Sequence, residues 1–347
     1  MSAVRLRVLL AVLVTVLAAL PAAAGARADA PGLLGYGEAQ VRISQLPLRG
    51  FTGGPITTTN TGETVRLYVA DAYLTADPTF AQRFADLLGA LVHGPEIATV
   101  TTYVAPLETV GRVCGTRALA CYDPRSETII TPGDDVAGRI TAAGVLAHEY
   151  GHHLANNRDN DPWAAIDYGT KRWASYTNVC RQAEAGALVP GDEGENYRLN
   201  PGEGFAEAYR VLNERRQGIA ESPWGIVSRL MYPDDEALRR LEQDVVEPWM
   251  RQPPTVVRGR FTKGGASART LALPTPHDGA LSVTLKSSLN TKLELRLRGA
   301  DGKVVALDAT GARTKTLTFD ICGERSFKIG VRRASGAGTY VLSISKP

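Results

Sequence analysis

A pentapeptide in the middle of the chain, His148-Glu149-Tyr150-Gly151-His152, constrains the fold most strongly. On an α-helix, residues four apart lie on one face about one turn from each other, so both imidazoles can reach a single metal ion. Glu149 follows the first His, where its carboxylate can approach the open side of that ion without binding it. Only five His occur in 347 residues, and three of them lie between His148 and His153. The sequence therefore predicts a helix that carries part of a metal site.

The flanking residues extend this predicted helix. Apolar residues at helical spacing indicate a helix from about 136 to 156, based on Val136, Ile140, Ala143, Gly144 and Ala147. His153 is rotated by about 100° from the face of the other two imidazoles, so we expect it to pack or lie at the surface rather than bind metal. The alternative is an ordinary core helix that carries two His.

The HExxH spacing resembles the helix signature of zinc hydrolases. This resemblance implies that Zn²⁺ is held by His148 and His152 and that Glu149 is the general base. The metzincin continuation of the motif needs a Gly three residues after the second His and a further His three residues beyond. The chain has Ala155 and Arg158 there, which excludes that class. A third ligand must come from elsewhere, because catalytic zinc usually has three protein ligands.

Two further acids, Glu203 and Glu207, are again four residues apart on a second predicted helix that ends near Arg216. Pro201 just before them and an acid in the first turn are typical of a helix N-terminus. The alternative is an amphipathic helix whose acids face water, with the third ligand among Asp159, Asp161 and Asp167.

The sequence motif ExFAExY at Glu203–Tyr209 resembles that of gluzincins, and is similar to the peptidase domain of anthrax lethal factor and its relatives. The resemblance implies that Glu203 is the third zinc ligand and that Glu207 accepts a hydrogen bond from a ligand His. It also implies that Tyr197 hydrogen-bonds the oxyanion, the alternative being a packed surface Tyr. The acidic stretch at residues 192–195 lacks a calcium-loop signature, and we expect solvated acids there.

The chain is predicted to have three parts. Residues 1–28 have a basic start, an apolar core and a small-residue region, which predicts an export signal, the alternative being an uncleaved anchor. Residues 29–254 form an α+β zincin-like metallopeptidase domain, and a Pro-rich stretch at 247–254 ends it. No other stretch is a candidate membrane span, so none is expected after signal cleavage.

Four elements are expected before the metal helix. They are a strand at 65–69, a helix at 78–93, a strand at 97–104 and a hairpin at 119–131. In zincins the strand just before the metal helix edges the cleft and pairs with extended substrate. Here that strand would be Glu127–Thr131, the alternative being an ordinary buried strand.

Residues 255–347 alternate apolar and polar side chains in short runs separated by turn signals, which predicts an all-β antiparallel sandwich. The strand pattern, the Asp301-Gly302 turn and the ending Gly336–Tyr340 resemble the bacterial pre-peptidase C-terminal domain, which is appended to secreted peptidases. This segment has 16 Lys and Arg against 6 Asp and Glu, a net charge of +10. It could therefore bind an anionic cell-wall polymer, or simply attract the acidic first part of the chain.

Four cysteines fit an oxidising compartment. Cys114 and Cys121 flank a short loop that a disulfide could close, which leaves Cys180 and Cys322 to join the two halves of the chain. Other connectivities and free buried thiols remain open at this point.

The sequence as a whole predicts a secreted zinc metallopeptidase with a peptide or protein substrate. The alternatives are a cell-wall polymer-binding protein on an inactive zincin scaffold and a zinc amidase that acts on a non-protein amide. No aromatic-basic strand pattern or known module suggests nucleic acid.

Overall fold

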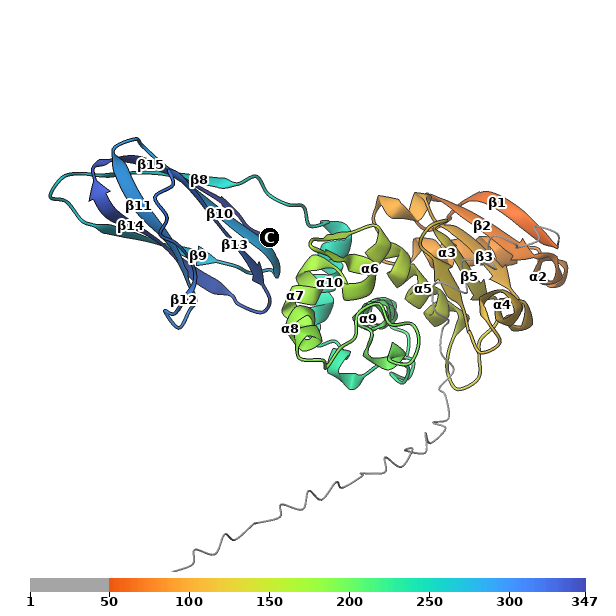
Figure 1. Ribbon diagram of the computed structural model, residues 1–347. Coiled ribbons are helices and arrows are strands. Elements are labelled where there is room, and N and C mark those ends of the chain that lie inside the picture. Colours follow the sequence, from red (N-terminus) through yellow and green to blue (C-terminus); the bar gives the residue numbers. More distant parts are fainter. Residues whose placement is uncertain (1–49) are drawn as a thin grey trace, which may run out of the picture. The chain divides into compact units, whose positions relative to one another are not determined.

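The computed structural model describes residues 50–347 (Figure 1). The expected export signal at residues 1–28, and the start of the expected catalytic domain up to residue 49, lie outside the described residues. In the described part, no helix is both long and apolar enough to cross a membrane.

A five-stranded mixed sheet with the order β1-β2-β3-β5-β4 is the first feature of the described chain. The strands β2, β3 and β5 run parallel, and β1 and β4 pair antiparallel at the two edges. Val65, Leu67 and Val69 are fully buried and alternate with more exposed residues, which confirms the predicted strand. The bounds are β1 (Phe51–Thr57), β2 (Thr64–Ala70), β3 (Thr101–Ala105), β4 (Cys121–Asp123) and β5 (Thr128–Pro132).

Strand β5 is not at the edge of the sheet, so the prediction that Glu127–Thr131 edges the cleft and pairs with extended substrate is wrong. It pairs with β3 on one side and β4 on the other, and all five of its residues are buried. The hairpin itself is confirmed, but β4 is its outer arm. Sequence alone could not decide this, because the inner arm of a hairpin is the one that pairs with a third strand far away along the chain.

The helices before and around the sheet are short. Those before the metal motif are α2 (Asp71–Ala76), α3 (Phe80–Gly89), the 3₁₀ turn η1 (Pro95–Ala98) and α4 (Leu107–Cys114). The predicted strand at 97–104 is therefore partly wrong, since Ile97 lies in η1 and strand pairing starts at Thr101. Ile97 is nevertheless buried, so its apolar side chain indicates burial and not strand conformation.

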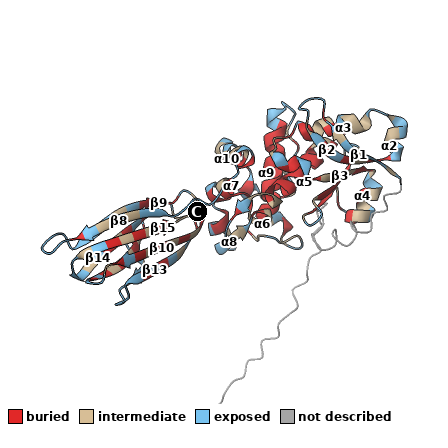
Figure 2. Cartoon of the chain, turned by 90° about the horizontal axis from the view of Figure 1, so that it is seen from above, coloured by how far each residue is buried: buried red, intermediate tan, exposed pale blue. Residues whose placement is uncertain are grey.

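Two longer helices, α5 (Ala142–Asn156) and α9 (Pro201–Arg216), occupy the centre of this region. Thirteen of the 15 residues of α5 and 14 of the 16 residues of α9 are buried, visible as red ribbon in Figure 2. A helix buried on all sides belongs to a core and not to a surface. The alternative of a second helix with its acids in water is therefore wrong.

Helix α5 starts later than the apolar spacing predicts. Gly138 and Arg139 have φ of +80° and +68°, which breaks any helix there. The backbone N–H of Val136 donates to the carbonyl of Ile140 (2.8 Å) and closes a tight turn. Thr141 then caps α5, because its hydroxyl accepts from the backbone N–H of Gly144 (2.9 Å).

Smaller elements connect and cover these two helices. Met231, from one of them, packs against Gly204 of α9. The elements are β6 (Asp159–Asn160), β7 (Trp163–Ala164), α6 (Ala165–Tyr168), α7 (Lys171–Tyr176), α8 (Val179–Glu184), η2 (Tyr197–Leu199), η3 (Arg229–Met231) and α10 (Asp235–Val246).

Residues 255–347 form two four-stranded antiparallel sheets, as predicted, with the orders β13-β10-β15-β8 and β12-β11-β14-β9. Apolar residues of both sheets form a second hydrophobic core, separate from the one around α5 and α9. The strands are β8 (Thr255–Phe261), β9 (Ala268–Pro274), β10 (Gly279–Ser287), β11 (Thr291–Arg298), β12 (Val304–Asp308), β13 (Thr314–Ile321), β14 (Ser326–Gly336) and β15 (Gly338–Ser345).

Both expected disulfides are present. Cys114 at the end of α4 is bonded to Cys121 at the start of β4, and Cys180 of α8 is bonded to Cys322 after β13. Disulfides persist in oxidising compartments, and their presence agrees with an extracellular protein.

Candidate metal centre

Helix α5 brings the two imidazoles of the motif to one buried point. His148 and His152 are each only 3% exposed, and their Nε2 atoms lie 3.3 Å apart. The i, i+4 geometry of the helix accounts for this convergence. Tyr150, between the two imidazoles in the sequence, makes a buried polar contact of its own: its hydroxyl donates to the carboxylate of Glu96 (3.2 Å).

Helix α9 supplies the third group. Asn200 caps this helix, since its Oδ1 accepts from the backbone N–H of Gly202 (3.0 Å), and Pro201 occupies the first helical position. Glu203 therefore lies in the first turn, where the helix dipole stabilises a carboxylate. It is 2% exposed.

The donor atoms of His148, His152 and Glu203 converge. The Oε2 of Glu203 lies 3.1 Å from His148 Nε2, and its Oε1 lies 3.3 Å from His152 Nε2. All three ligand atoms are within 4.8 Å of one another, so this group could hold a metal ion. Two imidazole nitrogens and one carboxylate are a donor set that suits Zn²⁺. The predicted metal residues are thus brought together.

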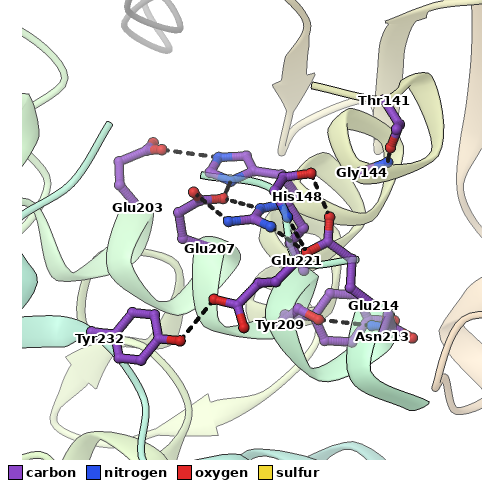
Figure 3. A network of polar contacts seen from close by, with 12 residues as sticks. Thr141, Gly144, His148, Glu203, Glu207, Tyr209, Asn213, Glu214, Glu221 and Tyr232 are labelled. Carbon is purple, nitrogen blue, oxygen red and sulfur yellow. Dashed lines mark hydrogen bonds and ion pairs between the residues drawn. The ribbon is translucent and has the colours of Figure 1, made fainter. Parts of the chain in front are cut away.

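Glu207 lies one turn further along α9, on the other ring nitrogen of His148 (Figure 3). The Nδ1 of His148 donates to Glu207 Oε2 over 3.1 Å. Because Glu207 holds the Nδ1 proton, His148 would bind a metal through Nε2, once the ion displaces the Nε2 proton. Arg210 holds Glu207 in turn through two hydrogen bonds, from Nε to Oε2 (2.7 Å) and from Nη2 to Oε1 (2.9 Å). The Glu207 carboxylate is thereby fixed on both sides.

The pKa values in this group follow from its charges. Burial lowers the pKa of His148, but the hydrogen bonds and charges of Glu203 and Glu207 outweigh burial and raise it to about 10. Burial raises the pKa of Glu207, but His148 and Arg210 outweigh it and lower the value to about 2. Against the same burial, His152 and His148 hold the pKa of Glu203 well below its usual range. Both carboxylates are therefore charged at neutral pH.

Glu149 differs from these two acids. It is 1% exposed, and its Oε1 has no hydrogen-bond partner among the described residues. Burial raises the pKa of Glu149 to about 7, with His148 and His152 opposing the shift. A buried polar atom without a partner is costly, so its presence beside the donor cluster calls for a functional explanation. A metal-associated water would satisfy it, and by this test the residues fit a catalytic metal.

Tyr197, in η2, lies at the same site. Its hydroxyl donates to Glu203 Oε2 over 2.6 Å, and burial together with the Glu203 charge raises the pKa of Tyr197 well above its usual value. The side chain is 8% exposed, so the alternative of a surface Tyr is wrong.

Glu193 is the site residue that sequence reasoning missed. Its Oε1 accepts from the Asn200 side chain (2.7 Å), the residue that caps α9. Burial and the neighbouring Glu203 raise the pKa of Glu193 to about 10. The expectation of solvated acids is therefore wrong at this position. The loop has no periodicity that could have indicated which of its acids points inward.

The remaining candidates lie elsewhere. His153 is fully buried and packs as expected, with Nε2 donating to the Glu96 carbonyl (2.9 Å) and Nδ1 accepting from the Tyr122 hydroxyl (3.1 Å). Asp159 and Asp161 are exposed and Asp167 is half-buried, and none belongs to the metal-binding group.

A small pocket of about 60 Å³ adjoins His148 and Glu149. Its wall is largely apolar, with Arg210 and Glu207 on one side. The apolar residues come from the loop before β4, the turn before α5, α5 itself and the loop after α9, and are Leu119, Ile140, Val145, Pro223 and Ile226.

Gly151 lets α5 and α9 approach closely enough to form the centre. A Cβ at this position would lie 2.8 Å from the Cα of Ala206, closer than real Cβ contacts. We expect Gly151→Ala to push the helices apart and to lower the free energy of unfolding by about 1–3 kcal/mol, as overpacking does. Metal affinity should fall as well, since Glu203 is on the helix that moves.

Thermal unfolding and metal content of the Gly151→Ala variant would measure both effects. Gly111→Ala is the matched control, because a Cβ on that helical glycine would meet its nearest neighbour, Thr116 Cα, at an ordinary 3.8 Å. Equal stability and metal content in the two variants would show that the close approach is not needed.

Comparisons with known proteins add little to this geometry. No protein-family model and no curated protein matches the chain. Among solved structures, the pre-peptidase C-terminal domain of a Bacillus anthracis collagenase is similar at 14% identity and a TM-score of 0.23, covering 26% of this chain and 89% of that domain. The periplasmic g-type lysozyme inhibitor PliG of Aeromonas hydrophila is similar at 12% identity and 0.22, covering 27% and 87%. At such scores the likeness decides neither fold nor function.

Proposed function

We propose that this protein is an exported zinc-dependent peptidase with a zincin-like catalytic region of the gluzincin type. One observation carries the proposal. The unpartnered Oε1 of buried Glu149 lies beside a cluster of two imidazoles and one carboxylate that could hold a metal. A scaffold without chemistry has no need for a buried carboxyl group in that place.

His148, His152 and Glu203 would hold Zn²⁺, which when bound would supply Lewis acidity and lower the pKa of a water toward neutrality. Glu149 takes the proton of the attacking water on its carboxylate and delivers it to the leaving amine.

Two further residues support this chemistry. Glu207 keeps the Nδ1 proton of His148 in place and so leaves Nε2 free for the metal. The Tyr197 hydroxyl donates to Glu203 Oε2 over 2.6 Å, and in this proposal it would turn from that carboxylate to donate to the oxyanion on the scissile carbonyl.

Turnover of a peptide library and of casein by the purified, zinc-loaded protein tests the proposal. We expect hydrolysis that falls to background after a chelator and returns when zinc is restored, because two His and one Glu hold the ion reversibly. Hydrolysis that is indifferent to the chelator would contradict a metal mechanism. Turnover of a non-protein amide alone, or of no substrate at all, would favour the amidase or the binding protein instead.

A further inference from the structure

The two outer faces of the C-terminal sandwich differ in charge. On β11, Leu293, Leu295 and Leu297 are buried, so the residues between them point outward. Strand β14 runs beside β11 (Figure 1), with Arg298 opposite Lys328 and Glu294 opposite Arg332. We call the outward residues of these two strands the basic face, and they are Lys292, Glu294, Arg296, Arg298, Lys328, Gly330 and Arg332.

The basic face is poorly neutralised. Its only acid, Glu294, lies 2.5 Å from Arg296 and 3.7 Å from Arg332. Arg298 and Lys328 are cross-strand neighbours with the same charge, an arrangement that destabilises a sheet. Five cations against one anion therefore cost folding free energy. A bound anion would offset this cost.

Gly330 lies in the middle of this face, between Lys328 and Arg332. Its φ is not positive, and an added Cβ would meet only Arg296, at an ordinary 3.7 Å from its Cβ and 3.9 Å from its carbonyl oxygen. The fold therefore has room for a side chain there. A glycine inside a strand weakens it and often marks a place where a ligand approaches the backbone closely. Here the missing side chain of Gly330 leaves the backbone accessible between the cations Lys328 and Arg332.

The opposite outer face, on β10 and β15, is mostly hydroxylic. Ser282 and Thr284 point outward on β10, opposite Ser345 and Ser343 of β15. It carries cations too: Lys286 is exposed on β10 itself, and Arg258 and Arg260 are exposed on the edge strand β8. The basic face, with five cations on two adjacent strands, therefore carries more cations than these three.

We propose that the basic face binds a linear phosphate-bearing polymer. Outward residues on one strand repeat at about 7 Å, which presents a row of cations to successive phosphates. Arginine forks bind phosphate with two parallel hydrogen bonds. The face carries no aromatic side chain on which bases could stack, so a polymer without bases fits better than single-stranded nucleic acid. This binding is independent of peptidase activity.

Equilibrium binding of long-chain polyphosphate to the full-length mature protein tests the proposal at several salt concentrations. The variant Arg298→Gln/Lys328→Gln should bind about tenfold more weakly. Its slope of log affinity against log salt should fall by about two, since each lost contact releases roughly one counterion fewer. The variant Arg258→Gln/Arg260→Gln removes the same charge from β8 and should bind like the wild type.

Gly330→Ala separates shape from charge. We expect the variant to unfold at the same or a higher temperature, because alanine fits there, yet to bind polyphosphate about threefold more weakly. If the two double variants lose equal affinity for polyphosphate, binding depends on the net charge of the domain and not on the basic face, and the proposal is overturned. Tighter binding of polyglutamate or of oligothymidylate than of polyphosphate would overturn the phosphate class, and unchanged binding by Gly330→Ala would overturn the close approach.

Discussion

Replacing Glu149 by Gln is expected to leave the metal in place and to lower peptide turnover roughly 10²–10⁴-fold, the usual contribution of a positioned general base. The substitution keeps the shape of the side chain and removes only its ability to take a proton. Glu149 is not in the donor group formed by His148, His152 and Glu203, so the metal content should stay at one ion per chain.

A loss of folded structure is a poor explanation for lower turnover in the Glu149→Gln variant. Oε1 of Glu149 has no partner among the described residues, so an amide in its place breaks no hydrogen bond made by that atom. Glu108→Gln, at an exposed position of α4, controls for the loss of one negative charge and should be fully active. Metal content, thermal unfolding and peptide turnover should be measured on all three proteins. A metal-loaded Glu149→Gln variant with wild-type turnover would place the base elsewhere.

The parts of the site that sequence could predict are those set by local geometry. The convergence of His148 and His152 follows from i, i+4 spacing on any helix, and so does the stacking of Glu203 and Glu207 on successive turns. The cap at Asn200 and the proline after it give the helix start as well. Each of these is decided within a few residues of the chain.

The parts that sequence could not predict depend on distant contacts. Val136 and Ile140 have helical spacing, yet the left-handed backbone of Gly138 and Arg139 turns the chain before α5 begins. Glu193 accepts a hydrogen bond from the Asn200 side chain, a contact that no periodicity in the sequence predicts. Burial and conformation at these positions are set by tertiary packing, which overrides local pattern.

The third ligand is the assignment on which the class of this centre depends, and Glu203 and Glu207 should respond differently to mutation. Glu203 contacts both imidazoles through their Nε2 atoms, whereas Glu207 contacts only the Nδ1 of His148. We therefore expect Glu203→Ala to lose stoichiometric zinc, because only two protein ligands remain. Glu207→Ala should keep measurable zinc and lose roughly 10–100-fold in affinity or activity.

Burial complicates one of these variants. Removing Glu207 takes two hydrogen bonds from buried Arg210, which keeps its hydrogen bond to Glu214. Glu207→Gln is the conservative companion, since its amide oxygen can still accept from Arg210 or from His148. Thermal unfolding of both variants shows whether a loss of metal comes from a loss of fold.

Mass spectrometry of metal content, after dialysis against a dilute chelator, decides between the two acids. Zinc retained at wild-type affinity by Glu203→Ala and absent from a folded Glu207→Gln would reverse the assignment. If both variants keep zinc fully, the ligand is another group, and Glu193 is the first to examine, because it already lies against Glu203. Loss in Glu203→Ala with partial retention in Glu207→Gln is the result that the geometry predicts. Only a carboxylate that reaches both Nε2 atoms completes the three-donor set.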